Sequence, residues 1–123
     1  MNKLNISIIS FLSILLLDFI YIGFVSQNMF NVMIKTIQGS VIKPRYLAIF
    51  ITYIFIFMSY FYFIILKRGS VQDAFILGIT TYAIYEFTNY SIFNKWNPTI
   101  VIIDTLWGGI LFSLTRFITK SFY

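Results

Sequence analysis

Four long apolar stretches, separated by short polar segments, constrain this chain more than any other feature of its sequence. They cover about residues 4–25, 45–66, 74–92 and 99–118. Each approaches the roughly 20 apolar residues with which a helix crosses the hydrocarbon core of a bilayer. Of the 123 residues, 59% are hydrophobic and 11% are charged, whereas soluble domains have about 25% charged residues. We therefore predict an all-α integral membrane bundle of four transmembrane helices, forming a single domain over residues 1–123.

The segment 26–43, between the first two stretches, has the pattern of an amphipathic helix. Phe30, Met33, Ile37 and Val41 recur at helical spacing. The opposite side carries Asn28, Asn31, Lys35 and Gln38. This pattern predicts a helix that lies in the membrane interface and is broken near Gly39. An ordinary loop is the alternative.

The basic residues suggest an orientation and a partner. With four spans both termini lie on one side of the membrane, and that side carries Lys3, Lys67, Arg68, Arg116 and Lys120. The other side carries Lys35, Lys43, Arg45 and Lys95. The excess of one basic residue favours cytoplasmic termini for this multi-pass protein. Because the basic residues are scattered, we expect them to anchor the chain in the lipid bilayer, and we do not expect a nucleic-acid partner.

The residue inventory restricts the chemistry. The chain has no cysteine and no histidine, which excludes disulfides, thiolate nucleophiles, zinc or haem ligation by these residues, and histidine proton relays. We expect neither a metal site nor a cofactor. Carboxylates, phenols and amides remain for chemistry.

Three of the four acidic residues, Asp18, Glu86 and Asp104, fall inside predicted spans. Asp18 and Glu86 each lie roughly 5 Å past the midpoint of spans that run in the same direction. Asp104 lies about 7 Å before the midpoint of a span that runs the opposite way. The three acids are therefore predicted to share one layer, in the half of the bilayer away from the termini.

An ionised carboxylate in hydrocarbon costs several kcal/mol, so intramembrane acids usually face the bundle interior, pair with partners or line water. No lysine or arginine is predicted at this depth, so protons, amides, phenols, water or a bound cation must neutralise the layer. Helical spacing places Tyr82 and Asn89 on the face of Glu86, Tyr21 beside Asp18, and Trp107 beside Asp104. The candidate ligand-binding or proton-binding residues are Asp18, Tyr82, Glu86, Asn89, Asp104 and Trp107.

Small residues indicate where two spans meet. Ala74 and Gly78 in the third span, and Thr105, Gly109 and Ser113 in the fourth, permit close backbone approach. We predict that these helices touch there and splay towards the acidic layer. The second span has no polar group deep within it beyond Thr52 and Ser59, so it is predicted to be peripheral, with residues 60–63 facing lipid. Trp96 is predicted to be a packing or interfacial residue.

Three fragments carry a family resemblance: "LLDFIYIG" at 16–23, "YAIYEFTN" at 82–89 and "DTLWGG" at 104–109. They resemble a family of small predicted membrane proteins, mostly bacterial, called domain of unknown function twenty-one seventy-seven. The chain departs from that family's pattern with Tyr21 in place of a tryptophan and Glu86 in place of an aspartate. The resemblance implies four spans, with Asp18, Glu86, Asn89, Asp104 and Trp107 at signature positions, and it implies no reaction.

These features favour a membrane protein that binds or carries a proton, a cation or a small amine-bearing ligand at the acidic layer. A chain this short is expected to form a homo-oligomer to enclose a path, with the second span as one contact. The alternative is a structural or assembly subunit whose protonated acids hold helices together, a contribution of about 0.6 to 2 kcal/mol. A lipid-modifying enzyme is disfavoured, because the chain lacks an aspartate-rich metal motif, an activated nucleophile and a phosphate-binding glycine loop.

Overall fold

The computed structural model describes residues 2–122, which are almost entirely helical. The α-helices are α1 (Lys3–Tyr21), α2 (Gln27–Gln38), α3 (Tyr46–Tyr60), α4 (Val71–Ile92) and α5 (Pro98–Thr119). Two π-helical segments, η1 (Ile22–Ser26) and η2 (Phe61–Leu66), and a 3₁₀ turn, η3 (Lys120–Phe122), complete the order. No strand occurs within residues 2–122. The predicted all-helical membrane bundle is confirmed.

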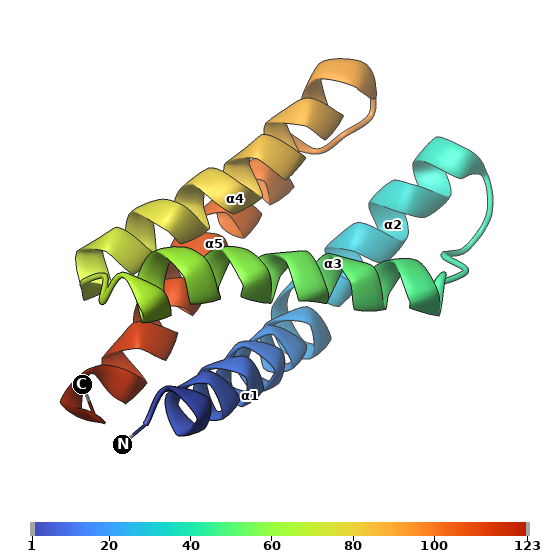
Figure 1. Ribbon diagram of the computed structural model, residues 1–123. Helices are drawn as coiled ribbons and strands as arrows, with labels where there is room; N and C mark the ends of the chain where they lie inside the picture. Colours follow the sequence, from blue (N-terminus) through green and yellow to red (C-terminus); the bar gives the residue numbers. More distant parts are fainter. Residues whose placement is uncertain (1, 123) are drawn as a thin grey trace.

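The helices form an antiparallel arrangement in which the amino and carboxyl ends of the chain lie at the same end of the molecule (Figure 1). Within the described residues, three continuous helices are long and apolar enough to cross a membrane: Lys3–Gln38, Tyr46–Leu66 and Pro98–Thr119. The third predicted span, residues 74–92, corresponds to α4, whose 22 residues provide about 33 Å of helix. Asp73, Glu86 and Asn89 make α4 more polar, and it packs along α5 over much of its length. Its passage through the bilayer remains a prediction.

The helix predicted between the first two spans is present, but it is not a separate element. Residues 3–38 form one helix of 36 residues, about 54 Å long, which exceeds the roughly 30 Å of a hydrocarbon core. The π-helical segment η1 joins α1 to α2, and α2 ends where Gly39 adopts a left-handed conformation with φ 78°. The apolar side of α2 packs on protein, because Met33 is buried against Trp96, Ile100 and Val101.

The contact between α4 and α5 requires glycine. A Cβ atom added to Gly78 would lie 2.0 Å from the carbonyl oxygen of Gly108, and a Cβ on Gly108 would lie 2.5 Å from the carbonyl oxygen of Gly78. A Cβ on Gly109 would lie 2.5 Å from the Ile79 side chain. The predicted close approach at Ala74, Gly78 and Gly109 therefore occurs, and Gly108 is the direct partner of Gly78.

The turns before α4 and α5 carry local capping signals that fix where these helices begin. The Ser70 side chain accepts a hydrogen bond from the Asp73 N–H at 3.0 Å, and the Asp73 carboxylate accepts one from the Ser70 N–H at 2.8 Å. This reciprocal capping box satisfies two free donors at the start of α4. At α5 the Asn97 side chain accepts from the Thr99 N–H, and Pro98 occupies the first turn.

The expectation that the second span is peripheral is wrong at its carboxyl half. Tyr60 is fully buried, and its ring packs edge-on against Phe112 of α5 at a centroid distance of 5.3 Å. Ile64 and Ile65 of η2 are also buried in this main core. Of residues 60–63, which were predicted to face lipid, Tyr62 and Phe63 are exposed, whereas Tyr60 is buried and the prediction is wrong for it. One side of α3 and η2 therefore packs against the bundle, while the other faces outward.

Candidate functional site

The structure brings the three intramembrane acids together in the interior of the bundle. Asp18, Glu86 and Asp104 are 5%, 0% and 6% exposed, and they come from α1, α4 and α5 respectively. On α1 the buried residues are Ile6, Ser10, Ile14, Asp18 and Tyr21. Their spacing of four, four, four and three residues is that of one helical face. Asp18 therefore lies on the face of α1 that packs into the core, and its side chain is buried there.

Asp18 accepts hydrogen bonds from two neutral donors on two other helices. The indole N–H of Trp107 on α5 donates to Asp18 Oδ1 at 2.9 Å. The hydroxyl of Tyr53 on α3 donates to Asp18 Oδ2. Both carboxyl oxygens thus have a fixed donor, and the acid joins α1 to α3 and α5.

Asp104 is bound to α1 through an aromatic pair. The hydroxyl of Tyr21 donates to Asp104 Oδ1 at 3.1 Å. The Tyr21 ring stacks on Trp107, with centroids 4.5 Å apart and planes within 5°. Because Trp107 in turn donates to Asp18, the stack positions the donors of two acids at once.

Glu86 lies at the far side of the cluster, near the turn between α4 and α5. The indole N–H of Trp96 in that turn donates to Glu86 Oε1 at 3.0 Å. The Glu86 carboxyl group also lies next to the carboxyl group of Asp104, and its Oε2 atom is buried without a hydrogen-bond partner. An ionised carboxylate is solely an acceptor, whereas a protonated carboxyl group can donate a hydrogen bond.

Two of the predicted neighbours of Glu86 have other contacts. The Tyr82 ring packs against the backbone of α5, where a Cβ on Gly108 would lie 2.5 Å from its carbon atoms. Asn89 lies beside Tyr85. The structure therefore gathers Asp18, Glu86, Asp104 and Trp107 into one network. It places Tyr82 beside that network as a packing residue and Asn89 beside Tyr85.

Sequence reasoning missed two donors, Tyr53 and Trp96. Tyr53 lies in a helix whose other residues are nearly all apolar or aromatic, so no spacing signal distinguished it. Trp96 was predicted to be a packing or interfacial residue, and its packing against Met33 and Ile100 agrees with that. Its closeness in sequence to Glu86, ten residues earlier, was nevertheless a usable signal. A tight turn after a helix folds the chain back, so that residues of the turn can contact the last turns of that helix.

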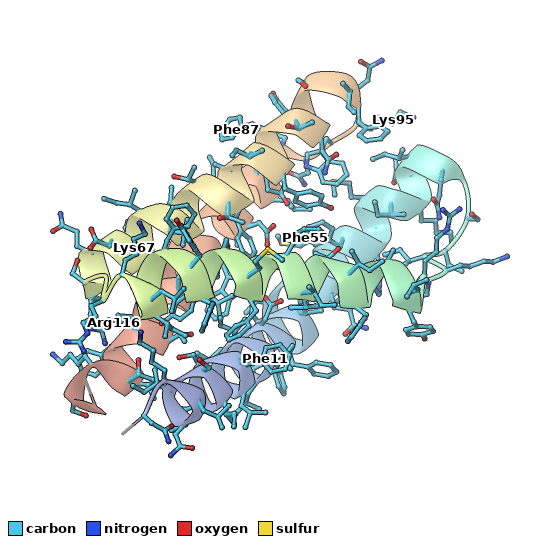
Figure 2. All side chains as sticks on the ribbon, viewed as in Figure 1. Phe11, Phe55, Lys67, Phe87, Lys95 and Arg116 are labelled. Atoms are coloured by element: carbon cyan, nitrogen blue, oxygen red, sulfur yellow. The ribbon has the colours of Figure 1, made fainter. Side chains whose placement is uncertain are left out.

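The cluster contains no basic side chain. Its four hydrogen-bond donors, Tyr21, Tyr53, Trp96 and Trp107, are all neutral. Lys67 and Arg116 lie at one end of the molecule and Lys95 at the other, away from the middle of the bundle (Figure 2). In residues 2–122 no three acidic side chains are arranged as a set of metal ligands. The arrangement orients each acid with neutral dipoles, and the buried Glu86 Oε2 atom, which has no hydrogen-bond partner, is a position where a carboxyl proton can reside.

Comparison with known proteins supports the family resemblance and adds no activity. No curated protein and no solved structure matches the chain. The family model described as "Predicted membrane protein (DUF2177)" matches residues 4–120, nearly the whole chain, so the predicted resemblance is confirmed. With its apolar helices and buried acids, this chain belongs to the DUF2177 family of predicted membrane proteins.

Proposed function

We propose that this membrane protein binds a proton within the bilayer at the cluster of Asp18, Glu86 and Asp104, and carries it. The observation that carries the proposal is the buried Oε2 atom of Glu86, which has no hydrogen-bond partner although its carboxyl group lies beside that of Asp104 among neutral donors. A proton on this oxygen would make Glu86 a hydrogen-bond donor to the neighbouring carboxyl group. Asp18, whose oxygens both accept from fixed donors, supplies a neighbouring carboxyl group for exchange. Chains of intramembrane acids are the usual proton relays of pumps and transporters.

A small cation or the ammonium group of an amine would satisfy the same oxygen atoms. The geometry favours these ligands less than a proton, because the three acids do not converge as ligands of one metal ion. Two of the acids instead lie next to each other. A bound cation would have to separate them, whereas a proton needs no additional space.

Proton carriage is tested in lipid vesicles that enclose a pH-sensitive dye. A potassium diffusion potential, negative inside, draws protons into vesicles that contain the full-length protein. We expect wild-type vesicles to acidify faster than protein-free vesicles, and Glu86→Gln vesicles to acidify at the protein-free rate. Asp73→Asn changes an exposed acid outside the cluster and should behave like wild type. Equal rates for wild type and Glu86→Gln would contradict carriage by this cluster.

The second candidate function is structural. It is favoured by the hydrogen bonds that join α1, α3 and α5 through Asp18 alone. In this case the acids would hold helices together, and the protein would act as a scaffold or assembly subunit of its membrane. Equal acidification rates together with a lower stability of the cluster variants would select this function.

A further inference from the structure

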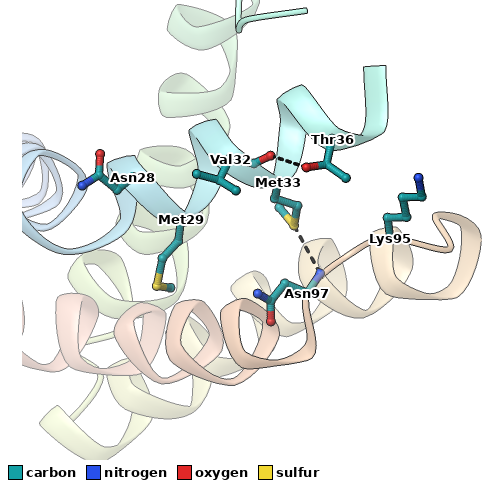
Figure 3. Close-up of a pocket in the computed structure, with 7 residues that line it drawn as sticks. All are labelled: Asn28, Met29, Val32, Met33, Thr36, Lys95 and Asn97. Atoms are coloured by element: carbon teal, nitrogen blue, oxygen red, sulfur yellow. Dashed lines mark hydrogen bonds between the residues drawn. The ribbon is translucent and has the colours of Figure 1, made fainter. Parts of the chain in front are cut away.

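A groove lies between α2 and the turn that joins α4 to α5, at the end of the molecule opposite the chain termini (Figures 1 and 3). Its volume is about 410 Å³. One wall is formed by α2 residues between Asn28 and Thr36, and the other by Lys95 and Asn97. The Asn97 N–H donates to the Met33 sulfur at 3.2 Å, which ties the two walls together.

The groove combines an apolar floor with polar donors. Met29, Val32 and Met33 provide apolar surface, while Asn28, Lys95 and Asn97 provide nitrogen atoms (Figure 3). The Asn97 side-chain oxygen is occupied, because it accepts from the Thr99 N–H at 2.8 Å. The amide nitrogen is therefore the group that Asn97 can offer a ligand.

The remaining polar wall residue contributes less. The Thr36 hydroxyl donates to the Val32 carbonyl at 2.8 Å, so its hydrogen is already used. Asn28 offers both an amide oxygen and an amide nitrogen, whereas Lys95 and the Asn97 amide nitrogen are donors only. Most of the free polar groups of the groove therefore favour a ligand that accepts hydrogen bonds.

The charge of the groove calls for an anion. Lys95 is its one ionised residue, and no acidic side chain lines it. The groove also lies at the expected level of lipid headgroups, because it is bordered by the last turn of α4 and the first turn of α5, and because α2 extends beyond the length of a single span. An apolar floor beside a cationic rim at this level fits a lipid with a phosphate group.

We propose that this groove binds an anionic phospholipid. Lys95 pairs with the phosphate, the amide nitrogen of Asn97 donates to a phosphate oxygen, and an acyl chain lies along Met33 and Met29 towards Asn28 (Figure 3). This site is independent of proton binding, since it involves none of the three buried acids.

The test is native mass spectrometry of the full-length protein in mild detergent with added phosphatidylglycerol or phosphatidylcholine. Wild type should retain phosphatidylglycerol in preference to phosphatidylcholine. Lys95→Gln should lower the retained phosphatidylglycerol roughly fivefold, the effect of one lysine at an anionic lipid surface. Lys35→Gln, which changes an exposed lysine of α2 outside the groove, should leave retention unchanged. An equal loss in both variants, or no preference in wild type, would overturn the proposal.

Inorganic phosphate separates a lipid site from a site for the free anion. We expect millimolar inorganic phosphate to leave the retained phosphatidylglycerol unchanged, because the apolar floor contributes to lipid binding. Displacement of the lipid by inorganic phosphate would overturn the assignment to a phospholipid. Both lysine variants lie on exposed positions, so each should fold like wild type, and circular dichroism checks this directly.

Discussion

The contact of α3 with the acidic cluster depends on a single atom, the hydroxyl oxygen of Tyr53. It donates to one oxygen of Asp18, while Trp107 donates to the other. Hydrogen bonds between helices in a membrane contribute about 0.6 kcal/mol on average and up to about 1.7 kcal/mol. A carboxyl acceptor with two fixed donors belongs towards the upper end of this range.

We therefore expect Tyr53→Phe to lower the free energy of unfolding by about 1 kcal/mol. The ring and its packing remain, so the change reports on the hydroxyl alone. Thermal unfolding in detergent provides the measurement. Tyr46→Phe, at a position 77% exposed, serves as the control and should unfold like wild type. A Tyr53→Phe protein as stable as wild type would show that the hydrogen bond does not hold α3 to the bundle.

Glu86 allows the role of charge to be separated from the role of hydrogen bonding. Glu86→Gln keeps an oxygen that accepts from Trp96 and places an NH₂ group towards Asp104, so its stability should stay within about 0.5 kcal/mol of wild type. Glu86→Ala leaves the buried Trp96 N–H without its acceptor and should cost about 1 to 3 kcal/mol. Equilibrium unfolding of both variants in detergent tests this. Equal losses would mean that Glu86 contributes by its volume and not by its carboxyl oxygens.

Among the contacts between helices, the packing of α4 on α5 depends most on glycine, which has no side chain. A methyl group on Gly78 would lie 2.0 Å from the Gly108 carbonyl oxygen, so the helices would have to move apart. Separating them would also disturb the contact between Glu86 on α4 and Asp104 on α5. The acidic cluster is therefore coupled to a backbone contact two helical turns away from Glu86.

Gly78→Ala should lower the free energy of unfolding by about 1 to 3 kcal/mol, the usual cost of overpacking a core. Gly23→Ala is the matched control, because a Cβ there meets nothing within 4 Å and alanine favours helix over glycine. Thermal melting of both variants in the same detergent provides the comparison. A Gly78→Ala protein that melts like Gly23→Ala would contradict the close packing of α4 on α5.

The helices and their close contact were predictable from the sequence, because apolar length, capping residues and small-residue spacing are local signals. The shared layer of acids followed from helix length and direction. The rotation of α3 about its axis was not predictable, since that helix is apolar or aromatic on every side and its sequence therefore indicates no inward face. Tyr53 and Tyr60 therefore became inward-facing residues only through packing against α1 and α5. The continuity of α1 with α2 was also missed, because polar residues at 26–28 resemble the end of a span.

For the molecule as a whole, the exposed outer side of α3 is where association is expected. Leu47, Phe50 and Phe55 are 74%, 61% and 61% exposed, and in a bilayer this surface meets either lipid or another copy. We expect native mass spectrometry to detect a homo-oligomer that Phe50→Ala and Phe55→Ala together weaken. Leu4→Ala and Leu16→Ala, at exposed positions on α1, form the control pair. Only monomers in wild-type spectra would contradict association.

The same spectra test for retained ligands. A small cation or amine that is present on wild type and absent from Glu86→Gln would replace the proton as the ligand of the cluster. Spectra in which each protein has the mass of its own chain, without adducts, are the outcome that proton binding predicts.

The most direct measurement of the central claim is infrared spectroscopy of the full-length protein in lipid, recorded over a range of pH for wild type and Glu86→Gln. A proton shared by Glu86 and Asp104 predicts an absorption of protonated carboxyl groups that shifts in D₂O, changes with pH and is altered or lost in Glu86→Gln. Identical carboxyl absorption in the two proteins, or an absorption unaffected by pH and D₂O, would contradict an exchangeable proton at this site.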